Sequence, residues 1–203
     1  MAEHLICNEE TAVRFRLGPL NMRIAVIGPQ NTGKTTFLKD FLKDFPKYKT
    51  TKKTYRDVIA KNRLNINQKT NEKSQKMIME FLYKEITKNK LPNILFDRCL
   101  IDNYVYSYCA YLKGEISKEF ILVTQRKMFD HLKFLDVIIF IPTSVSVKLI
   151  NDNVRDIDTG FIDLVNKIFF EVLFEISHKT NILIFVISGN RAERIRQVRG
   201  KLS

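Results

Sequence analysis

The chain has 203 residues, of which 45% are hydrophobic and 28% are charged, and its formal net charge is +12. This length suits one domain with a proper core, and no apolar run approaches the roughly 20 residues of a membrane-spanning helix. Cys7, Cys99 and Cys109 have no metal-ligand spacing, and the first residues lack the apolar core of a secretion signal. We therefore expect a cytoplasmic protein with reduced thiols and no membrane partner.

Residues 1–21 precede the first predicted strand and carry no chemical motif. The alternation of apolar and polar residues over Ala12–Leu17 suits either an added edge strand or a loose tail. We interpret residues 1–21 as an N-terminal extension and residues 22–203 as a single domain.

The domain begins with a short apolar run, residues 23–27, that predicts a buried strand. It leads into Gly28–Thr35, a sequence of the form G-x-x-x-x-G-K-S/T, and apolar residues at helical spacing follow over 36–43. This order of strand, loop and helix is typical of a phosphate-binding loop, or P-loop, in which backbone N–H groups surround phosphate oxygens. Lys34 would reach the β- and γ-phosphates, and the Thr35 hydroxyl would ligate Mg²⁺. The residues expected to bind ATP here are Gly28, Asn31, Thr32, Gly33, Lys34, Thr35 and Thr36.

A strongly basic stretch follows, over residues 43–76. It holds eleven basic and three acidic residues, a net charge of +8, and Tyr48 and Tyr55 are interleaved with the cations. Such a field favours polyanionic partners such as DNA or RNA, although a solvated lysine-rich surface has the same composition.

The rest of the chain alternates helices and strands. We predict a short β segment at 48–54, helices at 71–88, 101–112, 117–132, 160–177 and 191–201, and strands at 93–97, 137–141 and 182–187. This alternation indicates an α/β protein of the three-layer P-loop NTPase fold, with an open parallel sheet of about five strands and helices on both faces.

Further candidate site residues follow the predicted strands, because ligands of such sheets bind beyond the carboxyl ends of the strands. Asp97 ends one strand and suits either a metal-orienting residue or a general base, and Arg98 suits a phosphate clamp. Asp102 suits either a substrate contact or a helix N-cap. Arg155, on a polar loop, would stabilise charge on the transferred phosphoryl group, and the turn at Asn190 either lies against the purine of ATP or only joins strand to helix.

Three other patterns carry less chemistry. Tyr104, Tyr108 and Tyr111 share a helix face and either stack on a base or belong to the core. Gln75 either reads an acceptor or caps a helix. The histidines, His4, His131 and His178, have no partners in the sequence and are expected at the surface.

From about residue 22 to residue 198 the sequence resembles the bacterial and phage P-loop kinase-like ATPases, near the ribosylnicotinamide and thymidylate kinases. The resemblance rests on the P-loop and on Thr54–Asp57, Gln75, Asp97–Asp102, Asn153–Asp158, Ser188–Asn190 and Glu193-Arg194. Cys99 stands where the family usually has serine, and Asn153 where it usually has glycine. The resemblance implies a nucleoside- or nucleotide-kinase-like fold, ATP and Mg²⁺ as cofactors and a kinase-like lid.

Three functions remain open from the sequence. The first is transfer of the ATP γ-phosphate to a nucleoside or nucleotide, with Lys34, Asp97, Arg98 and Arg155 as catalytic residues, Thr35 and Asp97 at the metal, and Arg56, Gln75 and Asp102 at the acceptor. The second is the same chemistry on a nucleic-acid strand end or a hydroxymethylated base in DNA. The third is a nucleotide-dependent ATPase switch without an acceptor.

Overall fold

A computed structural model describes residues 21–143 and 159–202 of the protein. The alternating stretch Ala12–Leu17, Cys7 and Arg155 lie outside these described residues. The strands are β1 (Arg23–Ile27), β2 (Lys49–Thr50), β3 (Ile94–Asp97), β4 (Val137–Phe140) and β5 (Leu183–Val186). The helices are α1 (Lys34–Asp44), α2 (Tyr55–Asn62), the 3-10 turn η2 (Asn67–Lys69), α3 (Glu72–Lys88), α4 (Leu100–Leu112), α5 (Lys118–Leu132), α6 (Thr159–Lys179) and α7 (Arg191–Leu202).

The strands form one sheet in the order β2-β3-β1-β4-β5, and every pairing is parallel. The first described strand, β1, is therefore the middle one; β2 forms one edge, β3 lies between β2 and β1, and β4 and β5 extend the sheet on the other side. In this register Val26 lies beside Asp97 and Ile139, so the carboxyl ends of the three central strands meet at one rim. The predicted α/β fold with about five parallel strands is confirmed.

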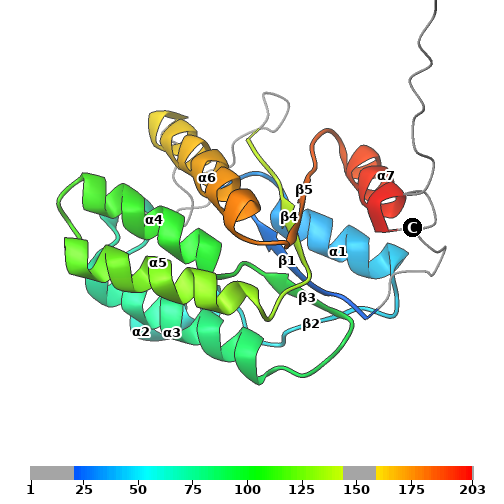
Figure 1. The fold of residues 1–203 in the computed structure, drawn as a ribbon, viewed down its shortest axis with the longest axis horizontal. Coiled ribbons are helices and arrows are strands. Elements are labelled where there is room, and N and C mark those ends of the chain that lie inside the picture. Colours follow the sequence, from blue (N-terminus) through cyan, green and yellow to red (C-terminus); the bar gives the residue numbers. More distant parts are fainter. Residues whose placement is uncertain (1–20, 144–158, 203) are drawn as a thin grey trace, which may run out of the picture.

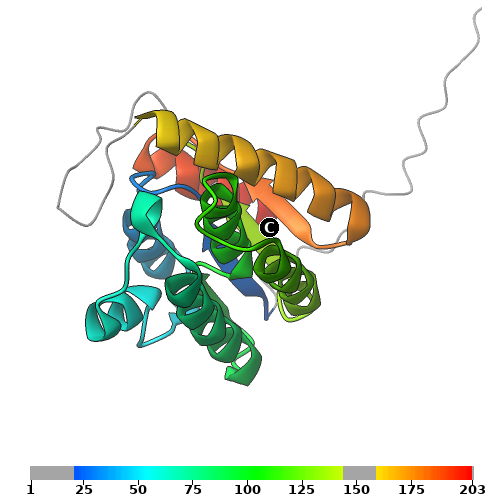
Figure 2. The same ribbon diagram turned by 90° about the vertical axis from the view of Figure 1, so that its left-hand side faces the viewer.

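The helices cover both faces of the sheet. Figure 1 shows α1 and α7 on one side and α4, α5 and α6 on the other, and Figure 2 shows α3 beside α4 and α5 in that second layer. Alternate strand residues supply the two cores, since successive side chains point to opposite faces. Ile24 and Val26 pack with Phe37 and Phe41 of α1, whereas Ala25 and Ile27 face the core shared with α3–α6.

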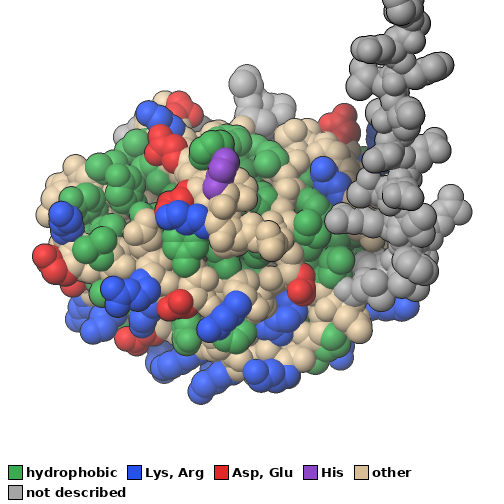
Figure 3. Space-filling view, viewed as in Figure 1, with side chains coloured by type: hydrophobic (Ala, Val, Ile, Leu, Met, Phe, Trp, Pro, Cys, Tyr) green, Lys and Arg blue, Asp and Glu red, His purple; other side chains and the backbone are tan. Residues whose placement is uncertain are grey.

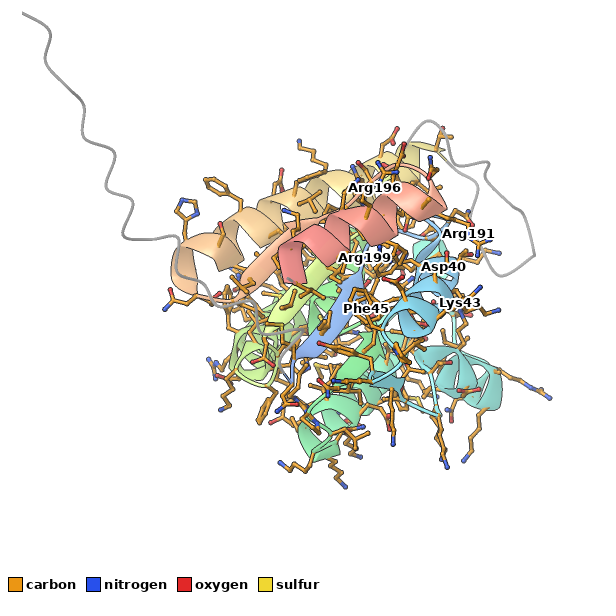
Figure 4. The ribbon with its side chains drawn as sticks, turned by 90° about the vertical axis from the view of Figure 1, so that its right-hand side faces the viewer. Asp40, Lys43, Phe45, Arg191, Arg196 and Arg199 are labelled. Atoms are coloured by element: carbon orange, nitrogen blue, oxygen red, sulfur yellow. The ribbon has the colours of Figure 1, made fainter. Side chains whose placement is uncertain are left out.

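Helix α7 is fastened to α1 along the first face. Arg191 donates to the carboxylate of Asp40 at 2.5 and 2.8 Å, and Figure 4 shows the two side chains meeting between the helices. Arg199 makes a second such pair with Asp44, one turn further along α1 and two turns further along α7. These pairs hold the end of the chain against the helix that follows the P-loop.

The structure differs from the sequence predictions most between residues 48 and 62. The predicted β segment shrinks to the two residues of β2, and α2 follows where no helix was predicted. The local signal for α2 is the pair Thr54 and Asp57, since the Asp57 carboxylate accepts a hydrogen bond from the Thr54 N–H at 2.7 Å. This is a capping box, which identifies a helix start even where apolar periodicity is weak.

One expectation about the histidines is wrong. His131 is fully buried on α5, three residues after the buried Met128, and neither ring nitrogen has a hydrogen-bond partner among the described residues. Helical spacing places His131 on the apolar face of α5. The expectation rested on the lack of a partner residue in the sequence, which does not determine whether a side chain is buried. His178 is exposed as expected, and His4 lies outside the described residues.

Two other expectations agree with the structure. Cys99 and Cys109 are buried free thiols. Tyr104 is buried, and Tyr108 and Tyr111 pack partly buried against the same core, with neighbouring ring centroids 6.0 Å apart. The packed-core alternative therefore describes this stripe. None of the helices in the described ranges has the length and apolarity that crossing a membrane requires.

Candidate active site

The predicted P-loop lies between β1 and α1, at the rim where the strands end. Gly28 has a φ of 140°, and a Cβ there would overlap the backbone carbonyl of Ile141, so the position accepts only glycine. Gly33 has a φ of 81° and caps α1, which begins at Lys34. The loop thus delivers backbone N–H groups to the N-terminus of a helix, where anions bind favourably.

Lys34 is 6% exposed and folds back onto its own loop. Its Nζ donates to the carbonyl oxygen of Pro29 and, at 3.1 Å, to the Thr32 hydroxyl. Burial and the nearby Arg98 guanidinium hold the pKa of Lys34 well below its ordinary value, while the carboxylates of Asp102 and Asp97 act in the opposite direction. Lys34 and Asp97 therefore lie at the same rim of the sheet.

Asp97 and Arg98 stand at the end of β3, next to β1. Asp97 is the last residue of the strand and is half-buried. Arg98 takes a φ of 77°, and its backbone N–H still donates to the Val26 carbonyl at 3.0 Å. The strand pairing therefore continues while the side chain turns toward the P-loop, where its Nη1 lies 3.4 Å from the Gly28 carbonyl oxygen.

Asp102 joins the P-loop to α4. Its Oδ1 accepts from Arg98 Nη1 at 2.6 Å and from the Gly28 N–H at 3.3 Å, and its Oδ2 accepts from the Cys99 N–H at 3.2 Å. The last contact belongs to a capping box in which Cys99 is the N-cap and Asp102 is the N3 residue, so Asp102 caps the helix from N3 and is not itself the N-cap. With the side chain 2% exposed, Asp102 orients Arg98 and the loop; its predicted contact with an acceptor stays a prediction.

A cavity of about 590 Å³ opens beside the P-loop. One wall is the loop itself from Gln30 to Thr36, another is α2 and the segment after it, and the third is α3 and α4. Arg98 lies between two aromatic rings of this cavity, 4.7 Å from the Tyr55 centroid and 5.7 Å from that of Tyr106. The volume is in the range of small-ligand sites, and its walls combine apolar side chains with a few oriented polar groups.

The cavity carries unpaired polar atoms. The Tyr106 hydroxyl donates to Gln30 Oε1 at 2.5 Å, and Asn103 Nδ2 donates to Gln75 Oε1 at 2.7 Å. Within the described residues, Gln30 Nε2, Asn103 Oδ1 and Arg98 Nε are buried without a hydrogen-bond partner. Because a buried polar atom without a partner costs stability, these three atoms are places in the cavity wall where hydrogen-bonding capacity is unused.

The three residues predicted at the acceptor all line this cavity, in different ways. Arg56 is exposed at its edge, with Nη2 3.5 Å from the Thr35 hydroxyl. Gln75 is buried on α3, and both ends of its amide are engaged, because Nε2 also donates to the Thr70 hydroxyl at 2.8 Å. Gln75 therefore holds Asn103 in place, and Asn103 presents the open acceptor atom.

The turn at Asn190 reaches the P-loop through Arg194. Asn190 and Glu193 exchange hydrogen bonds of 2.8 and 3.0 Å at the start of α7. Arg194, 6% exposed, donates from Nε to the Gly189 carbonyl and from Nη1 to the Thr32 carbonyl. The predicted purine contact of Asn190 stays a prediction, but its turn is anchored to the loop.

Sequence reasoning gave no site role to several residues that the structure brings to this rim. They are Gln30, Tyr55, Asn103, Tyr106 and Arg194. Gln30 lies inside the P-loop motif, and Arg194 follows Glu193 in the pattern that carried the family resemblance. Tyr55 likewise belongs to the Thr54–Asp57 segment of that pattern. Asn103 and Tyr106 sit on α4, where only the tertiary arrangement turns them toward the cavity.

The phosphate-binding loop connects β1 to α1, and an acid and an arginine from the neighbouring strand lie beside it. This combination defines a P-loop nucleotide-binding protein of the kinase-like type. A family model described as an AAA domain matches residues 23–194. The chain belongs to this family of P-loop kinase-like ATPases. No curated protein matches the sequence.

Solved structures show the same fold at low identity. A deoxyadenosine kinase from M. mycoides with products dCMP and dCDP aligns at a TM-score of 0.65 and 18% identity, over 89% of this chain and 98% of that one. The same enzyme with bound dCTP aligns at a TM-score of 0.65 and 19% identity, again over 89% of this chain and 98% of that one. A NadR protein in complex with NR aligns at a TM-score of 0.62 and 17% identity, over 87% of this chain and 50% of that one.

Proposed function

We propose that this protein is a phosphotransferase that moves the γ-phosphate of ATP, with Mg²⁺, to a nucleoside or nucleotide acceptor. The observation that carries the proposal is the cavity beside the P-loop, which gives an acceptor a place next to Lys34 and Arg98. A nucleotide-dependent switch that only hydrolyses ATP has no need of this second, partly apolar compartment. The likeness to nucleoside kinases supports the same reading.

The residues present fit ATP and Mg²⁺. The positive φ values of Gly28 and Gly33 let the loop turn back toward the N-terminus of α1, where backbone N–H groups can bind phosphate, and Thr35 lines the cavity. In the described part of the chain no group of three or more His, Cys, Asp or Glu could hold a metal by itself. Thr35, with Asp97 behind it, would therefore hold Mg²⁺ together with phosphate oxygens, as is usual for this ion, and the bound ion would neutralise charge on the phosphates.

The chain's own groups can supply positioning and charge. The Lys34 ammonium already points at the loop, where it donates to the Pro29 and Thr32 oxygens. On ATP binding it would exchange these oxygens for phosphate oxygens. Arg98, fixed by Asp102 and by two aromatic rings, would face the transferred group with Arg155. Asp97 would orient the metal or take the proton of the attacking hydroxyl. Phosphoryl transfer depends mainly on positioning of the reactants and on stabilisation of the developing charge.

The test uses γ-labelled ATP with a panel of nucleosides and nucleotides. We expect label on at least one acceptor, and Lys34→Ala should abolish the transfer. Lys39→Ala is the matched control, since Lys39 is exposed on the same helix. Near-normal transfer by Lys34→Ala would refute the mechanism, and release of labelled phosphate with no labelled acceptor would favour the ATPase switch.

A further inference from the structure

The net charge of the protein is concentrated in residues 47–76, which we call the basic segment. It runs from just before β2 through α2 into α3 and contains ten basic and two acidic residues, a net charge of +8 in a chain of +12. Each of the ten cations is exposed. They are Lys47, Lys49, Lys52, Lys53, Arg56, Lys61, Arg63, Lys69, Lys73 and Lys76. Figure 3 shows Lys and Arg side chains gathered along the lower edge of the molecule, where Figure 1 places β2, α2 and α3.

Among the described residues, none of these cations forms an ion pair. The Asp57 carboxylate accepts from the backbone and hydroxyl of Thr54, and the Glu72 carboxylate accepts from the Ser117 hydroxyl at 2.9 Å. Every ion pair between described residues lies outside the basic segment. The groove between α1 and α7 differs in this respect, because Arg191 and Arg199 there are paired with Asp40 and Asp44. In the described part of the chain, the positive charge of the basic segment is therefore not neutralised by ion pairs.

The same segment forms a wall of the cavity. Tyr55, Ile59, Ala60 and Ile66 line it, and the exposed Arg56 stands at its edge. A bound polyanion would thus run along the outside of the wall whose inside faces the acceptor site. A free nucleotide could occupy the cavity alone and would leave most of the ten cations without a role.

We propose that the basic segment binds the phosphodiester backbone of a single-stranded nucleic acid and that one nucleoside unit of this strand enters the cavity. The second half rests on the proposed function, and the first does not. A single strand is favoured because a base must leave its stack to enter a cavity of this kind. An anionic membrane is the less suitable partner, because none of the exposed large apolar side chains of the described residues lies within 47–76.

The first experiment measures binding of a fluorescein-labelled 15-nucleotide single strand to the full chain by anisotropy, over a series of salt concentrations. We expect affinity to fall steeply with salt, with a log–log slope of about −3 or steeper, as for several phosphates contacted. The double variant Lys52→Glu with Lys53→Glu should bind about tenfold more weakly with a shallower slope. Arg126→Glu with Lys133→Glu removes the same charge from exposed positions on and after α5 and should bind as the parent does.

Equal weakening in both double variants, or no salt-sensitive binding, would overturn the inference. So would binding to phosphatidylserine vesicles in place of the oligonucleotide. The second experiment offers γ-labelled ATP with the oligonucleotide and with free nucleosides. Label on the oligonucleotide supports the acceptor assignment, and label on free nucleosides alone overturns it. Strand binding by the parent protein without transfer of label to any acceptor would refute the proposed function and leave the binding surface standing.

Discussion

Arg194 donates a hydrogen bond from Nη1 to the carbonyl oxygen of Thr32 over 2.7 Å, across 162 residues of sequence. Its Nε donates to the Gly189 carbonyl at 2.9 Å, so one guanidinium spans the P-loop and the turn before α7. This buried link ties the P-loop to α7. The last helix of the domain therefore contributes to the geometry of its first motif.

Replacing Arg194 by methionine keeps the aliphatic bulk and removes both hydrogen bonds. A charge-assisted hydrogen bond contributes about 1.5–3 kcal/mol, and about 1.4 kcal/mol corresponds to a tenfold change in affinity. We expect Arg194→Met to weaken ATP binding about tenfold, measured by calorimetric titration, while an exposed neighbour variant, Arg196→Met, binds as before. Unchanged affinity in Arg194→Met would show that the P-loop does not depend on this link.

Removing the Asp102 carboxylate leaves the Arg98 guanidinium buried and unpaired. Loss of one member of a buried ion pair costs about 3–5 kcal/mol, and Asp102 also accepts from the Gly28 N–H. Asp102→Ala should therefore lower the free energy of unfolding in urea by about that amount. Asp130→Ala, at an exposed position of α5, should change it by less than about 0.5 kcal/mol. A loss below about 1 kcal/mol in Asp102→Ala would contradict the role assigned to the pair.

Gly28 and Gly200 form a matched pair of glycine substitutions. A Cβ at Gly28 would overlap the Ile141 carbonyl, whereas a Cβ at Gly200 in α7 would meet nothing within 4 Å. Gly28→Ala should destabilise the protein by about 1–3 kcal/mol through backbone displacement. Gly200→Ala should stabilise it by about 0.5 kcal/mol through helix propensity. Thermal unfolding of the two variants beside the parent measures both signs, and equal shifts would argue against the close approach of the P-loop to the chain after β4.

Burial lowers the pKa of His131 to about 3, and the Arg23 charge adds to the effect. In the unfolded chain His131 binds a proton near pH 6.5, so between these values the unfolded state holds one proton more than the folded state. Stability therefore falls as the pH falls through this window, by about 1.4 kcal/mol per unit from this group. His131→Leu should make the pH dependence of urea unfolding shallower by that slope between pH 6 and 4. As a control, His178→Gln, at an exposed position, should keep the pH dependence of the parent. If His131→Leu also kept the parent's pH dependence, a neutral buried imidazole at position 131 would be ruled out.

The P-loop and the parallel α/β sheet around it were predictable because they depend on local patterns. Glycine spacing, one lysine and a flanking apolar run define the loop within about a dozen residues, and regular alternation of helices and strands implies a parallel sheet. Helix α2 was missed because its apolar face is short, and its signal lay in the capping pair Thr54 and Asp57. His131 was misplaced because burial depends on which helix face meets the core.

What only the tertiary structure decided is the set of contacts that turn the loop into a site. Tyr106 meets Gln30 across 76 residues and Asp102 meets Gly28 across 74, and no periodicity in the sequence encodes such pairs. They arise because parallel strands bring their carboxyl ends to one rim, whatever the length of chain between them. The sequence by itself determined which motif forms the P-loop, since backbone geometry there follows from glycine positions. The fold decided which distant side chains hold that motif in place and which form the neighbouring cavity, because packing of α2, α4 and α7 sets those distances.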